Sequence, residues 1–355
     1  MNPVIFNDMK EIFDTGLVDW RRLYGKTVLV SGAYGMLASY MVFMLIFLNE
    51  TQPDADIRIL ALGRSRKKMA DRFGDYASRG YFTAVEQDVC ASSSGIPRAD
   101  FIIHAAGHSS PRLYGTHPVD VILPNTTGTL GLLEKARADQ AEGFLFFSSG
   151  AAQGLLDDRD SIAEQDMGYL DPMDVSSCYG ESKRLGETLC KGYCRQYGVP
   201  AKVVRPGHTY GPTLDLNDSR SFAAFVSDAV HGRDIAMKSA GDVMRVFCYI
   251  GDATLACFKV LLDAPAGEAY LVTDPDNVLA IRDLAALVAS LSRRPGTRVV
   301  RMHREAGDTH VEILPMTRHP RISVAKLQAL GWKSRVSLEE GFRRTIQSFL
   351  TGSAA

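Results

Sequence analysis

Short apolar runs alternate with longer helical patterns through the first two thirds of the chain, and this alternation restricts the fold more than any other feature. The apolar runs are expected to form strands at residues 27–31, 57–62, 82–85, 101–106, 144–147 and 201–206. Strands separated by helices are typical of parallel sheets, because parallel neighbours need a long crossover connection. The pattern therefore predicts an α/β fold with a doubly wound parallel sheet, followed by a smaller mixed α/β region.

A glycine turn joins the first strand to an apolar helix expected from Met36 to Leu48. Gly32 permits a tight turn, Gly35 lets the backbone approach a pyrophosphate, and Ala38 lets the helix pack closely on the sheet. A strand-to-helix turn without a ligand is the alternative interpretation. The apolar run is shorter than the about 20 residues that a helix needs to cross a bilayer, so we expect a buried helix and no membrane partner.

Several polar or small residues follow directly after the predicted strands. Gly32, Asp88, Ala105 and Ser149 all stand at such positions. Ligands of doubly wound sheets bind at the carboxyl ends of the strands. We therefore expect these four residues to border one binding site.

Tyr179 and Lys183 are four residues apart in a segment with a helical pattern. This spacing places both side chains on one face of a helix, one turn apart. A free phenol, with a pKa near ~10, is a poor base at neutral pH, but a nearby cation favours the phenolate. The pair is thus a candidate acid/base, although an exposed helical pair without function has the same spacing.

The end of the second strand carries a cofactor signal. Folds that select NAD usually place Asp or Glu there, whereas Arg accommodates the 2′-phosphate of NADP. Here Gly63 is followed by Arg64, and the basic run 66–68 comes next. We therefore predict NADP(H) over NAD(H); the alternative is that Arg64 only accompanies a helix start capped by Ser65.

Composition excludes several other functions. Lys and Arg number 40 against 41 Asp and Glu, and no basic block suggests nucleic-acid binding. The six cysteines form no C-x-x-C pair, so neither a metal site nor a disulfide framework is expected. Residues 1–25 show a helical extension without a cleavable-signal pattern, and we expect a cytoplasmic location.

A larger set of motifs runs through nearly the whole chain after residue 25. It comprises Gly32-x-x-Gly35-x-x-Ala38, Asp88-Val89, His104-Ala-Ala106, Asn125-x-x-Gly128-Thr129, Ser148-Ser149, Tyr179-x-x-x-Lys183, Arg205-Pro206, Tyr210-Gly-Pro212 and Arg245-x-Phe-x-Tyr-Ile-x-Asp252. Together they resemble the extended short-chain dehydrogenases/reductases that act on nucleotide sugars, the NAD-dependent epimerase/dehydratase family. The expected domains are a Rossmann domain at 26–206 and a substrate domain at 207–355, with the chain crossing back near 221–232 and 252–263.

The resemblance implies a role for each of these residues. Tyr179 is the implied acid/base, Lys183 lowers its pKa and binds the nicotinamide ribose, and Ser149 hydrogen-bonds the reacting oxygen. The implied cofactor-binding residues are Gly32, Tyr34, Gly35, Met36, Leu37, Arg64, Asp88, Val89, Ala105, Ala106, Asn125 and Lys183. The implied substrate-binding residues are Ser109, His208, Arg220 and Arg245, with a solvated loop charge as the alternative for Arg220.

Within the family, the run His108-Ser-Ser-Pro111 with Tyr114 and Pro118-Val-Asp is most similar to UDP-glucuronate decarboxylases and sugar 4-ketoreductases. The chain departs from the family at Gly150, where relatives usually carry Asp or Ser, and at Ala151, where they carry Glu. It also departs at Gln153, where they carry Tyr, and at His208, where many carry Asn. The Asn common after the late strand is also absent from the run 270–273. The residues for moving a hydride and a hydroxyl proton remain.

We therefore expect a nucleoside-diphosphate 4-keto-6-deoxysugar reductase. An epimerase acting through a transient ketone, a UDP-glucuronate decarboxylase and a silent NADP-binding regulatory protein are the alternatives. The resemblance also implies a homodimer built through a four-helix bundle. In this bundle the helix of Tyr179 would present Leu185, Leu189 and Tyr193.

Overall fold

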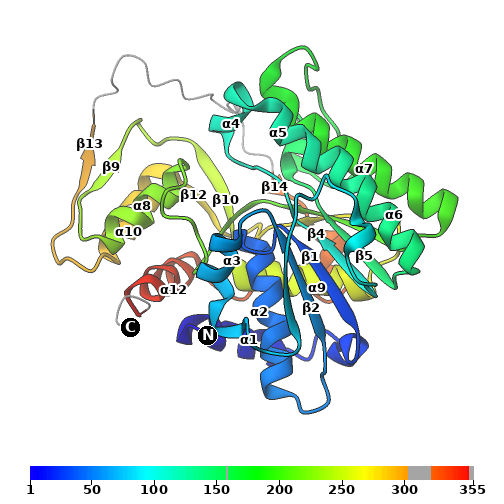
Figure 1. Cartoon of the computed structure of the whole chain (residues 1–355). Coiled ribbons are helices and arrows are strands. Elements are labelled where there is room, and N and C mark those ends of the chain that lie inside the picture. The colour runs from blue at the N-terminus through cyan, green and yellow to red at the C-terminus, as the bar shows by residue number, and fades with distance from the viewer. Residues whose placement is uncertain (157–158, 303–320, 352–355) are drawn as a thin grey trace.

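The structure is a computed structural model that describes residues 1–156, 159–302 and 321–351 (Figure 1). Its centre is a seven-stranded parallel sheet in the order β11-β7-β5-β4-β1-β2-β3. The strands are β1 (Thr27–Ser31), β2 (Arg58–Gly63), β3 (Phe82–Glu86), β4 (Phe101–His104), β5 (Gly143–Phe147), β7 (Ala201–Pro206) and β11 (Ala269–Val272). This sheet confirms the predicted doubly wound fold.

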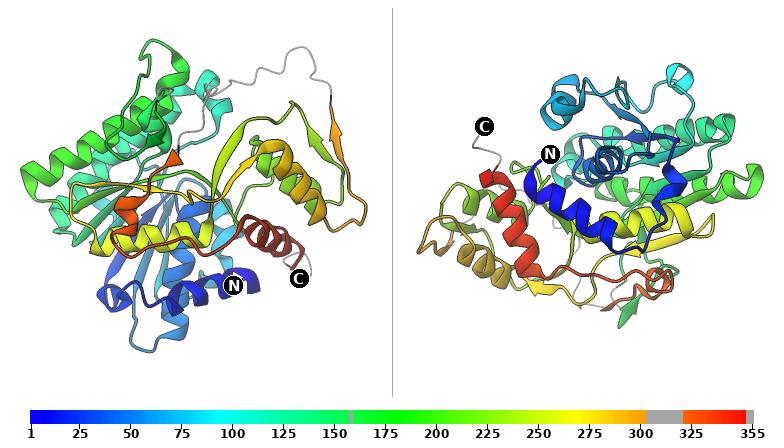
Figure 2. Two further views of the ribbon diagram at one scale, coloured as in Figure 1. Left: turned by 180° about the vertical axis from the view of Figure 1, so that it is seen from behind. Right: turned by 90° about the horizontal axis from the view of Figure 1, so that it is seen from below.

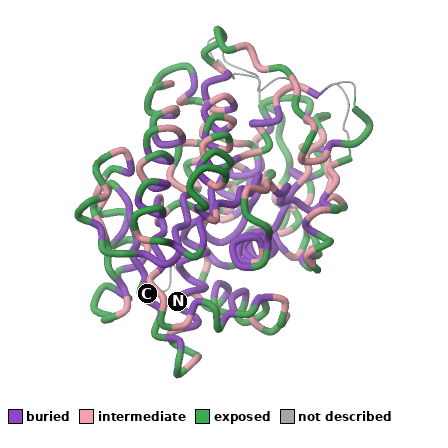
Figure 3. The backbone as a smooth tube through the Cα atoms, turned by 90° about the vertical axis from the view of Figure 1, so that its right-hand side faces the viewer, coloured by how far each residue is buried: buried purple, intermediate pink, exposed green. Residues whose placement is uncertain are grey.

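Helices cover both faces of the sheet (Figures 1 and 3). One face carries α2 (Met36–Thr51), α3 (Arg66–Phe73) and α9 (Ile250–Asp263), and the other carries α6 (Thr129–Asp139) and α7 (Cys178–Tyr197). Successive strand residues point to opposite faces, so Val28 and Val30 join one core while Leu29 joins the other. Burial on both faces explains why these strands are apolar runs without polar alternation.

Helix α2 is buried on nearly every side. All residues from Ala38 to Leu48 are buried, because the sheet covers one side of the helix and α1 (Pro3–Asp14) and α9 pack on the others. Among the described residues, no helix is both long enough and apolar enough to cross a membrane. The apolar run thus belongs to the protein core.

The helix expected around residues 118–138 contains a break in its hydrogen-bond register. It consists of α5 (Pro118–Leu123), a π-helical turn η4 (Pro124–Gly128) and α6, and α4 (Pro111–Thr116) precedes it. Pro124 has no N–H to donate to the preceding turn, which disrupts the α-helical ladder. The side-chain amide of Asn125 donates to the carbonyl of Val121 at 2.9 Å in the same region.

A second layer lies beside the sheet. Its elements are β8 (His208–Tyr210), α8 (Ser221–Val230), β9 (Ile235–Met237), β10 (Met244–Tyr249), β12 (Val278–Ala280), α10 (Ile281–Ser290), β13 (Val299–Arg301) and α12 (Leu338–Thr351); β6 (Ser161–Ile162), β14 (Arg321–Ile322) and α11 (Ala325–Gln328) are shorter. Helix α9 returns to the main sheet, whereas α8 packs against α10 and α12. Residues 303–320 and 352–355 of the expected substrate domain lie outside the described residues.

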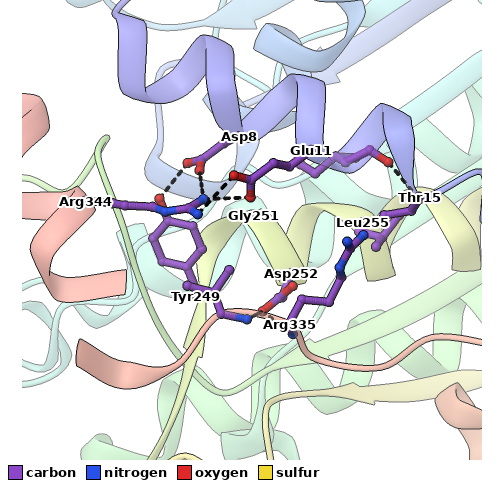
Figure 4. A pocket seen from close by; sticks show the side chains of 11 residues that line it. Asp8, Glu11, Thr15, Tyr249, Gly251, Asp252, Leu255, Arg335 and Arg344 are labelled. Carbon is purple, nitrogen blue, oxygen red and sulfur yellow. Dashed lines mark hydrogen bonds and ion pairs between the residues drawn. The ribbon is translucent and has the colours of Figure 1, made fainter. Parts of the chain in front are cut away.

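The N-terminal helix is fastened to the C-terminal helix by a buried carboxylate. Figure 2 shows α1 and α12 side by side, and Figure 4 shows the contact. Asp8, 2% exposed, accepts hydrogen bonds from Tyr40 at 2.7 Å and Tyr249 at 2.6 Å, and pairs with Arg344 at 2.8 Å. Four elements, α1, α2, β10 and α12, thus meet at one side chain.

We predict that Asp8→Ala lowers the free energy of unfolding by about 3 kcal/mol, because it leaves two buried phenols without their acceptor and removes one of the carboxylates that bind Arg344. Denaturant titration measures the loss. Asp14→Ala on the same helix is the matched control, since its pair with Lys10 is exposed and contributes at most about 1 kcal/mol. Equal effects of the two substitutions would contradict the anchoring role.

Candidate active site

The site begins where the strand order reverses. Strand β1 lies between β4 and β2, so the chain leaves it on one side and returns on the other, which opens a crevice at the carboxyl ends of β1 and β4. Gly32 lies there with φ +67°, and a Cβ on it would come within 2.7 Å of the Cα of Ala106. Only glycine fits this turn.

The surroundings of this turn can hold a dinucleotide. Gly35 is the N-cap of α2 and no side chain caps the helix, which leaves the amides of Met36 and Leu37 at an uncapped N-terminus suited to phosphate. The ring of Tyr34 covers Gly63, where a Cβ would lie 2.5 Å from it. Val89 packs on Gly128, where a Cβ would lie 2.9 Å from its side chain.

Arg64 connects the second strand to the site. Its guanidinium is 3.7 Å from the carboxylate of Asp88 and 2.8 Å from Nε2 of His108, while half of the side chain stays exposed. Burial and the neighbouring charge of Arg64 lower the pKa of His108, so the ring can accept this hydrogen bond. The hydroxyl of Ser65 also caps α3, as expected if Arg64 only accompanied a helix start. This cap does not prevent Arg64 from lying beside the site.

Asn125 is fully buried beneath the crevice. Its amide nitrogen donates to Val121 and to Ser182, but its Oδ1 has no hydrogen-bond partner. A Cβ on Gly107 would lie 3.0 Å from this oxygen and 3.6 Å from Nζ of Lys183. A buried unpaired acceptor beside the ammonium group and a glycine cradle fits a bound ribose that brings its own hydroxyl donors.

Tyr179 lies on the first turn of α7 and stacks on Tyr114, with ring centroids 5.2 Å apart and planes 12° apart. Part of Tyr179 is reachable by solvent, but the packed protein around it raises the pKa of its phenol. The hydrogen bond with Ser149 and the charge of Arg220 oppose this increase. The structure therefore brings Ser149 and Tyr179 together, and Tyr114 holds the ring.

Lys183 is one turn further along α7, as its spacing predicts. Its Nζ donates to the carbonyl of Phe147 at 2.6 Å and lies 5.8 Å from the ring centroid of Tyr179. Burial lowers the pKa of Lys183 to about 7. The groups that oppose the raised pKa of Tyr179 are Ser149 and Arg220, while Lys183 directs its ammonium at the strand; a role of Lys183 in favouring the phenolate stays a prediction.

His104 is a residue of the site whose role the sequence did not reveal. Its Nδ1 is 2.7 Å from the hydroxyl of Ser31, and its Nε2 is 3.1 Å from both the carbonyl of Pro124 and the hydroxyl of Thr129. Burial, and then the charge of Lys183, lower the pKa of His104 to about 3, so the ring stays neutral. His104 thus connects β1 and β4 to the π-helical turn. Its position in the motif at the end of a predicted strand was the feature of the sequence that could have indicated this role.

The structure places the four expected substrate residues as follows: three carry or lie near a positive charge, and Ser109 contributes its backbone carbonyl to a contact with Tyr114. His208 faces Arg245 and Arg220, whose charges, after burial, lower its pKa to about 3. Arg220 is held by the carboxylate of Asp218, whereas among the described residues no carboxylate pairs with Arg245. Arg245 is thus free to bind an anion. Ser109 lies on an exposed loop, where its carbonyl accepts a hydrogen bond from the hydroxyl of Tyr114.

The positions that depart from the family pattern carry no acid. Gly150 is exposed, and a Cβ there would meet no atom within 4 Å. Ala151 is partly buried, and Gln153 is 3% exposed with its amide donating to the carbonyls of Ala163 and Asp166. Gln153 therefore serves the loop structure. The described residues also contain no group of His, Cys, Asp and Glu that could hold a metal ion.

The fold, the glycine turn and the Ser149, Tyr179 and Lys183 group define an oxidoreductase-type dinucleotide site. The model of the NAD dependent epimerase/dehydratase family matches residues 28–273. The chain therefore belongs to this family and is an enzyme. This confirms the resemblance that the motifs indicated.

Individual relatives agree with this assignment. UDP-glucuronic acid decarboxylase 6 of Arabidopsis thaliana is 27% identical over 322 residues, which cover 91% of this chain and 88% of that protein. An epimerase of Methanothermobacter thermautotrophicus has a TM-score of 0.79 at 21% identity, covering 96% and 98% of the two chains. UDP-glucuronic acid 4-epimerase from Bacillus cereus, solved with NAD, has a TM-score of 0.73 at 18% identity, covering 91% and 96%. At these identities the two structures show a shared fold.

Proposed function

We propose that the protein reduces the 4-keto group of a nucleoside-diphosphate 4-keto-6-deoxysugar with NADPH. The observation that carries the proposal is the assembled Ser149, Tyr179 and Lys183 group with no carboxylate at Gly150 or Ala151. Removing water across C5 and C6 needs an acid and a base besides the tyrosine. Hydride transfer with one proton transfer does not.

The residues divide the work as follows. The dinucleotide, when bound, supplies the hydride to C4 of the sugar. The phenol of Tyr179 donates its proton to the C4 oxygen, and the hydroxyl of Ser149 holds that oxygen in place. The ammonium of Lys183 stabilises the phenolate that remains, and Arg245 binds the diphosphate. Residues 26–206 would thus bind the cofactor and residues 207–355 the sugar nucleotide.

A second candidate is supported by the relatives. The Arabidopsis protein is a UDP-glucuronic acid decarboxylase, and its likeness extends over 91% of this chain. Decarboxylation also begins with oxidation at C4, for which Tyr179 and Lys183 suffice. Epimerisation through a transient ketone uses the same residues. In either reaction the cofactor is regenerated within each turnover.

The preference for NADP(H) is supported by charge at the end of β2. Arg64 is half exposed beside the crevice, and Lys68 lies over the ring of Tyr34 at 5.9 Å. No carboxylate occupies the position at Gly63 or Arg64 that would accept a ribose 2′-hydroxyl. The Bacillus cereus relative was solved with NAD, so the choice of cofactor is an experimental question.

We also propose a homodimer. Val119, Leu123, Leu130 and Leu185 are between 41% and 59% exposed on α5, α6 and α7, which lie side by side in Figure 1. Several exposed apolar side chains on neighbouring helices are typical of interfaces. Of the three residues expected there, Leu185 is exposed and Leu189 partly buried, but Tyr193 packs on α6 and hydrogen-bonds Glu134, so it is not available.

The reaction is tested with NADPH and a panel of enzymatically made nucleoside-diphosphate 4-keto sugars. We expect one NADPH to be consumed for each sugar reduced. The loss of NADPH absorbance measures the consumption, and the stereochemistry of the product identifies the reduced sugar. Conversion of an unoxidised nucleotide sugar to its epimer without added cofactor, or release of carbon dioxide from UDP-glucuronate, would overturn the reductase.

Tyr179→Phe should keep cofactor affinity, because the ring still stacks on Tyr114, but lower kcat by at least about a hundredfold. Tyr169→Phe is the matched control, since Tyr169 is 64% exposed. Turnover that is unchanged in Tyr179→Phe would contradict the catalytic role. A chain without turnover on any sugar but with cofactor binding would be the silent regulatory protein.

Arg64→Ala should weaken NADP(H) binding roughly tenfold or more and NAD(H) binding far less, because it removes charge-assisted hydrogen bonds to the 2′-phosphate. Fluorescence titration of both cofactors measures the difference. Lys67→Ala is the control, since Lys67 points to solvent and pairs with Asp71. Equal or tighter binding of NAD(H) by the unsubstituted chain would refute the preference.

Leu123→Glu combined with Leu185→Glu should convert the dimer to a monomer, because burying two carboxylates at the interface is unfavourable. Light scattering at micromolar concentration gives the mass. Val243→Glu, at a similarly exposed position in the second layer, should leave the mass unchanged. A monomeric mass for the unsubstituted chain would argue against the dimer.

A further inference from the structure

Helix α7 holds the end of strand β5 with three side chains spaced one turn apart. Tyr179 hydrogen-bonds Ser149, Lys183 donates to the carbonyl of Phe147, and Glu187 accepts from the hydroxyl of Ser148 at 2.5 Å. Each of three consecutive residues of the strand end is therefore bound by one of the three side chains. The sequence pair Tyr179 and Lys183 is part of a longer set that ends at Glu187.

The carboxylate of Glu187 is fixed from a second direction. Arg205 on β7 donates to both of its oxygens, at 2.8 Å and 2.6 Å, and also to the carbonyl of Glu164 at 2.7 Å. The side chain of Arg205 is 5% exposed and that of Glu187 is 13% exposed. A bidentate, largely buried salt bridge of this kind gives the carboxylate a defined position.

Few charges surround the ammonium group of Lys183. The pKa of Lys183 is lowered by burial, and Glu187 is the carboxylate whose charge opposes that change. Cys190 on α7 stays a neutral thiol because burial raises its pKa, and His104 on β4 stays a neutral ring. Tyr179 presents its ring face. The protonation of Lys183 therefore depends on the charge of Glu187.

We propose that Glu187 is a positioning residue for the reaction: fixed by Arg205 and Ser148, its carboxylate keeps Lys183 protonated and in register with Tyr179. The proposal deepens the proposed function, because a protonated Lys183 is what stabilises the phenolate of Tyr179. The proposal thus extends the functional face of α7 by one turn, from Tyr179 and Lys183 to Glu187. Arg205 and Ser148 then act on the reaction through Glu187.

The proposal is tested by titrating Lys183 in full-length protein with ¹³C-labelled lysine and NMR, with Lys183→Met as the assignment control. In the unsubstituted chain the Lys183 signal should titrate near pH 7. Glu187→Gln keeps the size of the side chain and its acceptor for Ser148 but removes the charge. It should move the titration to lower pH by about one unit or more.

Three further variants separate charge from packing. Glu187→Asp retains the charge and should return the titration toward its original position. Glu187→Gln with Arg205→Met avoids a buried unpaired cation, should fold, and should still show the lower titration. Glu181→Gln removes a carboxylate from another face of α7, where it pairs with Arg184, and should change nothing.

An unmoved Lys183 titration in the folded Glu187→Gln and double variants would overturn the proposal. This readout needs no turnover, so it stands apart from the proposed function. Where turnover is found, the high-pH limb of the kcat profile should move to lower pH in Glu187→Gln, with KM changed less than about twofold. A loss of kcat without any shift of that limb would show a purely structural role.

Discussion

The site depends on how closely helix α7 approaches strand β5. A Cβ on Gly186 would lie 2.4 Å from the ring of Phe146, and one on Gly180 would lie 2.8 Å from the carbonyl of Ala151. Real Cβ atoms do not come this close to their neighbours, so these two glycines set the distance between helix and strand. At that distance the side chains of Tyr179 and Lys183 reach the strand end. If a methyl group on either glycine pushed α7 away from the strand, these contacts would be lost.

Charge in the site follows from the same close packing. Three carboxylates near it are already paired: Asp88 with Arg64, Asp218 with Arg220, and Glu187 with Arg205. Among the described residues, Arg245 lacks such a partner, and the ammonium of Lys183 has only a carbonyl as its direct hydrogen-bond acceptor. The site therefore offers cations without a carboxylate partner to a ligand. Nucleoside diphosphates and dinucleotides are anionic ligands of the kind that such a site attracts.

Sequence reasoning predicted those features that depend on neighbouring residues in the chain. Buried strands appear as apolar runs, and Gly32 is recognisable because the turn after a first strand has few alternatives. The π-helical turn at Pro124, the packing of Tyr193 and the anchor at Asp8 were missed. The last two depend on contacts between segments far apart in the sequence, whereas the first has a local cause in Pro124 that the helical pattern of residues 118–138 concealed. The direction of Lys183 was also missed, because spacing on a helix places a side chain on a face but does not choose its acceptor.

The two altered positions after β5 differ in what the fold demands of them. Gln153 is committed to structure: its amide holds the turn at 163–166, and Glu164 in that turn accepts from Arg205 and from the backbone of Leu271. The fold does not require glycine at position 150, because its φ is not positive and a Cβ there would meet no atom within 4 Å. Packing therefore leaves room for a carboxylate at 150 that the chain does not use. Packing thus does not require the absence of an acid at position 150, whereas it does explain Gln153.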